Sequence, residues 1–233
     1  GVNFEKIDST HYLISYDSGA NLMAQVIEVN AGTYAVTTVG TPLTTGTTQP
    51  APQSHVVQMD ATHYSVSLTK RTAGTSGWFM IVEVNLGTWD VTTATALTDL
   101  GTGAPANSYI TSYYIDALTW TFKISATKVV VFYATGPSAS IETCYRVIDI
   151  NTGTWVITVG ALEMFGGVAG AYMDAAYLTQ ADLTVAEAYF SANLRLYQGQ
   201  AMWKIGFDVA QDKVTVLSNA FNTWTSGSLI RYS

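Results

Sequence analysis

A short segment recurs along the chain and constrains the fold more than any other feature. IEVNAGTY at Ile27–Tyr34 returns as VEVNLGTW at Val82–Trp89 and as IDINTGTW at Ile148–Trp155. A degenerate form, FDVAQDKV, occupies Phe207–Val214. Each copy alternates apolar and polar residues up to a short turn, and a β-favouring run follows. Because Asn and Gly tolerate the positive φ angles of tight hairpin turns, the pattern predicts a repeated antiparallel hairpin.

The segment upstream of this hairpin is also repeated. KIDSTHYLISY at Lys6–Tyr16 precedes the first copy, and QMDATHYSVSL at Gln58–Leu68 precedes the second. Both contain Asp-x-Thr-His-Tyr followed by alternating residues, so the first two repeats are near copies. Two alignments stay open for the later repeats. The first places Ile124–Tyr133 and Thr179–Ala188 opposite the Asp-x-Thr-His segment, and the second uses Tyr114–Leu118 and Tyr172–Ala176.

Each repeat contains four β-like runs, and no long stretch combines helical periodicity with helix caps. In the first repeat the runs are Asn3–Asp8, His11–Asp17, Met23–Asn30 and Tyr34–Leu43. In the second they are His55–Asp60, His63–Lys70, Trp78–Asn85 and Trp89–Leu97. Ala169–Glu187 is the one segment in which a helical turn is compatible with the sequence.

Four antiparallel strands repeated four times predict an all-β fold, specifically a β-propeller with four blades of four strands. We expect one domain, 1–233, with blades near 2–48, 54–103, 108–166 and 170–224. A closing strand at 226–233 would pair with the first blade and remove an unpaired edge. The alternative is five blades with one degenerate, because the irregular segment Ala104–Ile124 could contain part of a further blade.

The pattern I-D-x-T-H-Y, followed by A-Q-V-x-x-V-N-x-G-T-W and V-T-T, resembles the propeller repeats of phage and environmental-virus proteins, tail-associated ones among them. The resemblance covers repeats one to three clearly and repeat four loosely. It implies a virion-associated binding or structural module. Because the motif belongs to the blade framework, it carries no functional residues over to this chain.

Composition argues against several classes of partner. The 233-residue chain has a formal net charge of −7 and no basic stripe, so neither nucleic acid nor an anionic membrane is an expected partner. Its long uncharged runs are broken by Thr, Gln, Pro and Gly, so no membrane insertion is expected. The lone Cys144 is expected to be a small buried residue on a strand. The chain begins with Gly1 and shows no basic-then-apolar leader, as expected of a processed, excised or tagged chain.

Four aspartates fall into a regular series under the second alignment: Asp8, Asp60, Asp116 and Asp174. If all four close the innermost strands, they would ring one mouth of a central channel and could hold a cation. The favoured alternative is that each begins a strand-to-strand turn by accepting a backbone N–H. His11 and His63 occupy equivalent positions, and we expect them to hydrogen-bond within a blade rather than to bind zinc. No cofactor is expected.

The aromatic residues fall into two groups. Tyr34, Trp89 and Trp155 share one position of the repeat and are expected to pack between blades. A second group lies in the least repetitive stretch, where propellers often place binding loops. This candidate ligand-binding group contains Tyr109, Tyr113, Tyr114 and Trp120, and the alternative is that these rings fill the core.

The sequence therefore favours a non-enzymatic binding or structural module that displays loops on a rigid propeller. Its location would be a virion, as in a tail fibre, or the outside of a cell. The expected partners are a glycan, a cell-surface receptor or neighbouring virion proteins. The alternative is a carbohydrate-active enzyme that uses inner-strand aspartates.

Overall fold

The structure is a computed structural model that describes residues 2–18, 21–46, 50–70, 76–101, 119–135, 142–164, 171–173, 187–194, 199–208 and 213–222. Within these ranges the chain forms strands and turns and contains no helix. The predicted all-β class is therefore confirmed. The described part of Ala169–Glu187 is extended rather than helical, because residues 171–173 form a strand.

The strands form four antiparallel sheets in which spatial order follows chain order. The first sheet contains β1 (Val2–Lys6), β2 (His11–Asp17), β3 (Leu22–Val29) and β4 (Val36–Thr44). The second contains β5 (Pro50–Gln58), β6 (His63–Lys70), β7 (Ser76–Val84) and β8 (Val91–Asp99). The third contains β9 (Thr119–Ser125), β10 (Lys128–Thr135), β11 (Glu142–Asn151) and β12 (Val156–Val159), with the short β13 (Glu163–Met164) also on β11. The fourth contains β14 (Ala171–Met173), β15 (Glu187–Leu194), β16 (Gly199–Asp208) and β17 (Lys213–Asn222).

Strand register decides how the third repeat aligns with the first two. His11 lies opposite Glu28, His63 opposite Glu83, and Lys128 opposite Asp149. Each acidic partner stands two residues before the Asn of its turn, so Lys128 occupies the histidine position. Ser125 then occupies the position of Asp8 and Asp60. The alignment through Ile124–Tyr133 is therefore correct for the third repeat, and the one that gives this position to Asp116 is wrong.

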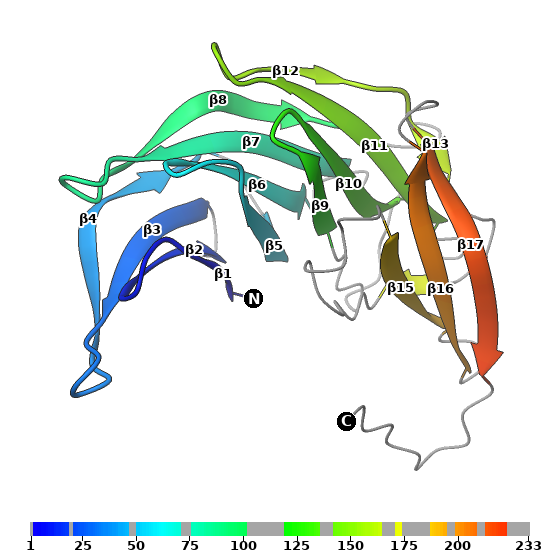
Figure 1. The fold of residues 1–233 in the computed structure, drawn as a ribbon, viewed down its shortest axis with the longest axis horizontal. Helices are drawn as coiled ribbons and strands as arrows, with labels where there is room; N and C mark the ends of the chain where they lie inside the picture. Colours follow the sequence, from blue (N-terminus) through cyan, green and yellow to red (C-terminus); the bar gives the residue numbers. More distant parts are fainter. Residues whose placement is uncertain are drawn as a thin grey trace.

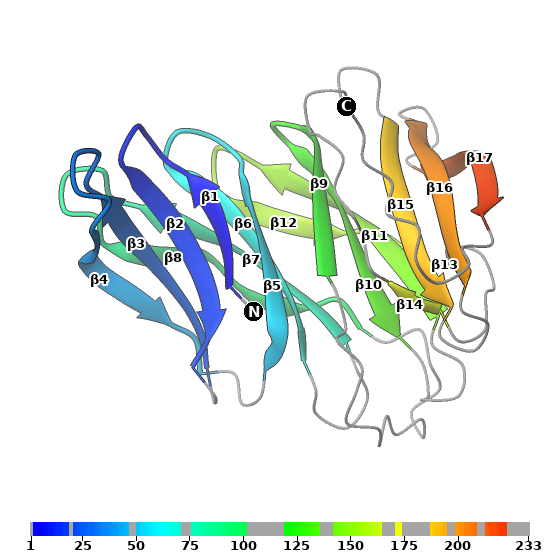
Figure 2. The same cartoon turned by 90° about the horizontal axis from the view of Figure 1, so that it is seen from below.

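The four sheets follow one another along an open arc (Figure 1). β1, β5 and β9 lie on the inner side of the arc, whereas β4, β8, β12 and β17 lie on the outer side. Seen after a 90° turn, neighbouring sheets stand side by side with their faces toward one another (Figure 2). No strand pairing between the first and fourth sheets occurs among the described residues. The expected closing strand at 226–233 lies outside those residues.

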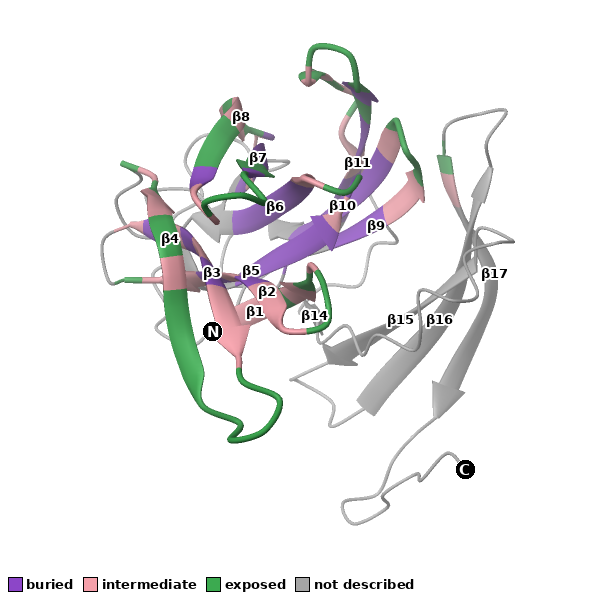
Figure 3. Cartoon of the chain, turned by 60° about the vertical axis from the view of Figure 1, so that its left-hand side comes forward, coloured by how far each residue is buried: buried purple, intermediate pink, exposed green. Residues whose placement is uncertain are grey.

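The hydrophobic core lies between the sheets and follows the two-residue period of the strands. On β7, Met80, Val82 and Val84 belong to the cluster shared with the first sheet. The alternate residues Phe79 and Ile81 belong to the cluster shared with the third sheet. β7 is therefore buried on both faces. Buried residues are concentrated in the strands in the middle of the molecule (Figure 3). Cys144 is fully buried on β11 within the second cluster, as predicted.

Candidate functional site

The Asn-x-Gly-Thr turn has the same geometry in three repeats. The Asn30 side-chain oxygen accepts a hydrogen bond from Gly32 N at 2.9 Å, and Asn85 and Asn151 hold Gly87 and Gly153 at 2.9 and 3.0 Å. The residue that ends each turn donates its N–H to the Asn carbonyl. That residue adopts positive φ: 57° at Tyr34, 64° at Trp89 and 55° at Trp155.

Positive φ was expected at Asn or Gly, and instead the aromatic residue adopts it. For a residue with a Cβ, this left-handed conformation costs roughly 1–2 kcal/mol. An aromatic side chain is therefore placed at an unfavourable backbone position in three turns. In the second and third repeats the ring makes a stacking contact across a sheet interface in this conformation.

The Asp-x-Thr-His segment builds a second turn, between the first two strands of a sheet. The Asp8 carboxylate accepts hydrogen bonds from Thr10 N and His11 N, both at 2.8 Å, and lies 2.9 Å from Nδ1 of His11. Asp60 binds Thr62 N and His63 N in the same way, at 2.8 and 2.7 Å. The predicted turn role of both aspartates is confirmed. In the third repeat Ser125 Oγ accepts the equivalent hydrogen bond from Thr127 N at 3.2 Å.

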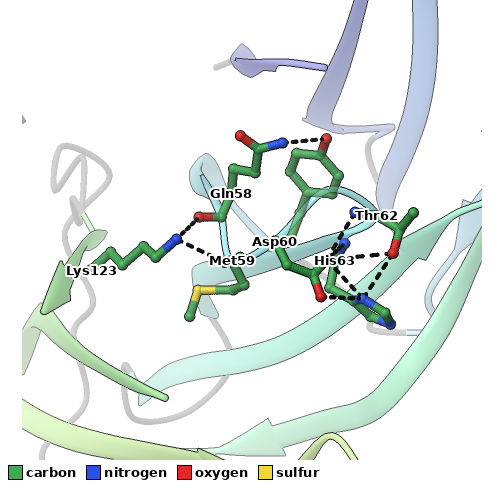
Figure 4. A network of polar contacts seen from close by, with 7 residues as sticks. Gln58, Met59, Asp60, Thr62, His63 and Lys123 are labelled. Atoms are coloured by element: carbon green, nitrogen blue, oxygen red, sulfur yellow. Dashed lines mark hydrogen bonds and ion pairs between the residues drawn. The ribbon is translucent and has the colours of Figure 1, made fainter. Parts of the chain in front are cut away.

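These contacts fix the charge of both aspartates. The Thr10 N–H, then the N–H and imidazole of His11, lower the pKa of Asp8 to about 2, although desolvation opposes them. Burial would raise the pKa of Asp60, but hydrogen bonds from Thr62 and His63 outweigh it and lower the pKa. Both carboxylates are therefore ionised at neutral pH and engaged within their own turns, as Figure 4 shows for Asp60.

The two kinds of turn meet between neighbouring sheets. His11 of the first sheet stacks on Trp89 of the second, with ring centroids 3.8 Å apart and planes 16° apart. His63 of the second stacks on Trp155 of the third at 3.7 Å and 19°. We call this His–Trp stack, with its supporting Asp and Asn turns, the joint. The predicted packing of Trp89 and Trp155 between sheets is confirmed.

Tyr34 is different from the other two aromatic residues at this position. Its side chain is 79% exposed, whereas Trp89 and Trp155 each stack on a histidine of a neighbouring sheet. The expectation that Tyr34 packs between blades is therefore wrong within this chain.

Further contacts recur at both joints. Val56 N donates to Oδ1 of Asn3 at 3.0 Å, and Thr121 N donates to Nδ1 of His55 at 3.2 Å. Strand register makes Asn3 equivalent to His55 and Val56 equivalent to Thr121. On β5 and on β9, one backbone N–H at the strand edge thus donates to a side chain of the preceding sheet. Burial lowers the pKa of His55 to about 4, so its imidazole is neutral at pH 7 and accepts this bond.

Hydroxyl groups also bridge neighbouring sheets near the inner strands. Ser15 and Ser54 bring their Oγ atoms to 2.5 Å, and Thr121 Oγ1 donates to Ser67 Oγ at 2.7 Å. Ser15 and Ser67 are equivalent by register, and all four residues are buried. On the outer side, the Thr95 hydroxyl donates to the Trp155 carbonyl. The equivalent Gly40 approaches the Trp89 carbonyl so closely that a Cβ would collide with it.

A charged network crosses the inner side of the second joint (Figure 4). Lys123 Nζ donates to the carbonyl oxygens of Gln58 and Met59 at 3.0 and 2.7 Å. Gln58 Nε2 donates to the Tyr64 hydroxyl at 3.2 Å. Burial raises the pKa of Glu5 on β1, although the Gln58 N–H and the Lys123 charge oppose the rise. These groups hold the inner strands β1, β5 and β9 together.

Only some of the predicted site residues lie in the part of the chain that the structure describes. Among the described residues, no three His, Cys, Asp or Glu side chains gather as they would around a metal ion. Asp116 and Asp174 lie outside the described residues, as do Tyr109, Tyr113 and Tyr114. The backbone of Trp120 lies in β9 opposite Phe132. Its side chain is not described.

Sequence reasoning missed the His–Trp stack, although the repeats contain a signal for it. The third repeat has Lys128 in place of histidine, and the fourth repeat has Val214 in place of the aromatic residue. Loss of the histidine in one repeat thus accompanies loss of the aromatic residue in the next. Lys128 instead pairs with Asp149 at 3.1 Å.

Comparison with known proteins adds little to this description. No family model matches the chain, and no curated protein matches it. Among solved structures, the chain is similar to the crystal structure of a protein from Lactobacillus plantarum. The match has 9% identity and a TM-score of 0.31, and it covers 90% of this chain and 67% of the other. No helix of the described residues is long and apolar enough to cross a membrane.

Proposed function

We propose that this chain is a non-enzymatic β-propeller module that holds binding loops on a rigid scaffold, with four repeats as its blades. The proposal rests on one observation: the polar and aromatic residues that recur in the repeats are engaged in contacts within the joint. Asp8 and Asp60 close turns, and His11 and His63 stack on tryptophans. Among the described residues, none of the four belongs to a cluster of three or more acidic, His or Cys side chains. These repeated side chains therefore stabilise the turns and the contacts between sheets.

Recognition would fall to the segments that depart from the repeat. The stretch from 102 to 118 separates β8 from β9 and contains Tyr109, Tyr113 and Tyr114. Aromatic rings beside polar groups suit a sugar, because CH groups pack on ring faces while hydroxyls need polar partners. We propose a glycan or a glycosylated cell-surface receptor as the ligand. The likeness of the repeat to phage and environmental-virus propellers supports a virion or extracellular location.

A glycan array tests this proposal directly. The chain should bind a restricted set of glycans, and replacing Tyr113 and Tyr114 together by Ala should abolish that binding. Tyr34→Ala is the matched control, because it removes an exposed tyrosine outside the stretch. Retention of binding by the double variant, or equal loss in the control, would contradict the placement of the site.

An enzymatic assay tests the non-enzymatic part separately. The chain should not hydrolyse chromogenic glycosides. Turnover that disappears in Asp60→Asn, with folding intact by circular dichroism, would establish a carbohydrate-active enzyme instead.

A further inference from the structure

Arg146 on β11 places a charged side chain where the preceding repeat has an apolar one. It stands five residues before Asn151, as Met80 stands five residues before Asn85. Met80 is buried in the cluster shared by the first and second sheets, whereas Arg146 is only partly buried. Partial removal of a guanidinium from water is unfavourable unless its charge and its N–H groups find partners. The contacts of this side chain therefore show which of its groups are engaged and which are available.

The described contacts orient the guanidinium through two of its nitrogen atoms. Arg146 Nε donates to the Tyr133 hydroxyl at 3.3 Å, and Nη1 donates to the Gly160 carbonyl at 2.6 Å. The Tyr133 hydroxyl donates in turn to the Leu100 carbonyl at 3.1 Å. Among the residues that the structure describes, Nη2 has no hydrogen-bond acceptor. A Cβ at Gly101 would lie 3.3 Å from Nη2, so the glycine leaves this nitrogen uncovered on that side.

The charge of Arg146 is also without a carboxylate partner in the described part of the chain. Lys128 and Lys213 each pair with an acidic side chain, but Arg146 forms no such pair there. The acid nearest to Gly101 in sequence on β8 is Asp99, and its carboxylate accepts the Gly101 N–H at 2.8 Å instead. A guanidinium with available N–H groups suits a carboxylate, because its planar fork matches the two carboxylate oxygens.

We propose that Arg146 binds a carboxylate of the ligand, so that the glycan is an acidic one. This inference rests on the glycan-binding function proposed above and narrows its ligand class. Gly101 is followed directly by the stretch 102–118, to which recognition is assigned, so the guanidinium lies where that stretch begins. Tyr133 and Gly160 orient the guanidinium, and Nη2 donates to the carboxylate.

The first test compares acidic glycans with their neutral counterparts on one array. The probes are sialyl and uronic acid oligosaccharides, the same compounds as methyl esters, and sulfated and neutral oligosaccharides. The bound set should consist of carboxylate-bearing glycans, and esterification should weaken binding by about tenfold or more, because a charge-assisted hydrogen bond is lost. A bound set of neutral or only sulfated glycans would overturn this inference and leave the proposed function intact. Absence of binding to any glycan would overturn both.

A pair of variants at Gly101 tests the role of Arg146 without removing its support of Tyr133 and Gly160. Gly101→Asp would set a carboxylate beside Nη2, and Gly101→Asn is the matched control with the same shape and no charge. Asp and Asn both tolerate the positive φ of 77° at this position. Gly101→Asp should bind the esterification-sensitive glycans at least about tenfold more weakly than Gly101→Asn, because its own carboxylate occupies the guanidinium. The melting temperature of Gly101→Asp should equal or exceed that of Gly101→Asn. Equal affinity of the two variants, whether retained or lost, would overturn the proposal.

Discussion

The imidazole of His63 lies on the indole of Trp155, with ring centroids 3.7 Å apart and ring planes 19° apart. The two residues come from different sheets, and each is fixed by its own turn. Asp60 orients the histidine, and Asn151 accepts the N–H of the tryptophan. The stack therefore couples two local turns across a sheet interface. The same relationship between His11 and Trp89 repeats it one sheet earlier.

Replacing the corner aromatic by glycine should have opposite effects in the first and second repeats. Trp89→Gly loses the stack and buried ring area, and we expect a net loss of about 1–3 kcal/mol after relief of the left-handed backbone. Tyr34→Gly loses an exposed ring and gains the same relief, so stability should change between zero and about 1 kcal/mol in the favourable direction. Urea denaturation at a concentration where the chain is monomeric measures both. A comparable loss in Tyr34→Gly would contradict this account of the corner.

Gly40 should be irreplaceable at the first joint. Its φ is 66°, and an added Cβ would collide with the Trp89 carbonyl. Gly40→Ala should therefore lower the free energy of unfolding by about 2–4 kcal/mol. Gly46→Ala serves as control, because no atom lies within 4 Å of a Cβ built there. Equal melting temperatures for the two variants would show that the sheets are not held this closely.

The Asp60 turn should depend on a side-chain acceptor more than on charge. Asp60→Ala leaves Thr62 N and His63 N without their acceptor and should cost about 1–2 kcal/mol. Asp60→Asn keeps an acceptor oxygen and should recover most of that loss. Because the pKa of Asp60 is lowered in the folded state, the carboxylate's contribution is present above the ordinary carboxyl pKa and fades as pH falls below it. The difference in free energy of unfolding between wild type and Asp60→Asn should therefore become smaller as the pH falls. Denaturation at several pH values measures this difference.

The strand pattern could be predicted from the sequence because it depends on local features. Alternation places the strands of the first two repeats within a few residues of their observed positions, and the Asp-x-Thr-His turn marks where β2 and β6 begin. The third repeat was ambiguous because Ser125 replaces the aspartate. The turn needs only an oxygen that accepts an N–H, so residue identity was a poor guide and strand register was needed.

The joint could not be predicted in the same way, because its partners come from different repeats. His63 and Trp155 are distant in sequence, and neither turn alone indicates which ring it meets. The exposure of Tyr34 was missed for a related reason. Its position in the repeat is the same as that of Trp89, but burial at this position depends on a ring from a neighbouring sheet, which the repeat pattern alone does not reveal.

His55 should make stability depend on pH well above the carboxyl range. Burial lowers its pKa from 6.5 to about 4, so below pH 6.5 the unfolded chain binds a proton that the folded chain does not. The contribution of His55 to the free energy of unfolding is fully present above pH 6.5 and falls as the pH drops toward 4. The total loss is about 3 kcal/mol, because one pKa unit corresponds to about 1.4 kcal/mol. His55→Asn introduces the residue found at the equivalent Asn3 and should keep the acceptor for Thr121 N. The variant should lose this pH dependence, and an unchanged slope between pH 4 and 6.5 would contradict the role of His55.

A double-mutant cycle on His63 and Trp155 tests most directly whether the sheets are linked in series by one repeated joint. Alanine substitutions, singly and together, should give a coupling free energy of about 0.5–1.5 kcal/mol for this pair and a similar value for His11 and Trp89. The mismatched pair His11 and Trp155, two sheets apart, should be additive within about 0.5 kcal/mol. Additivity in both stacked pairs, or equal coupling in the mismatched pair, would contradict the account.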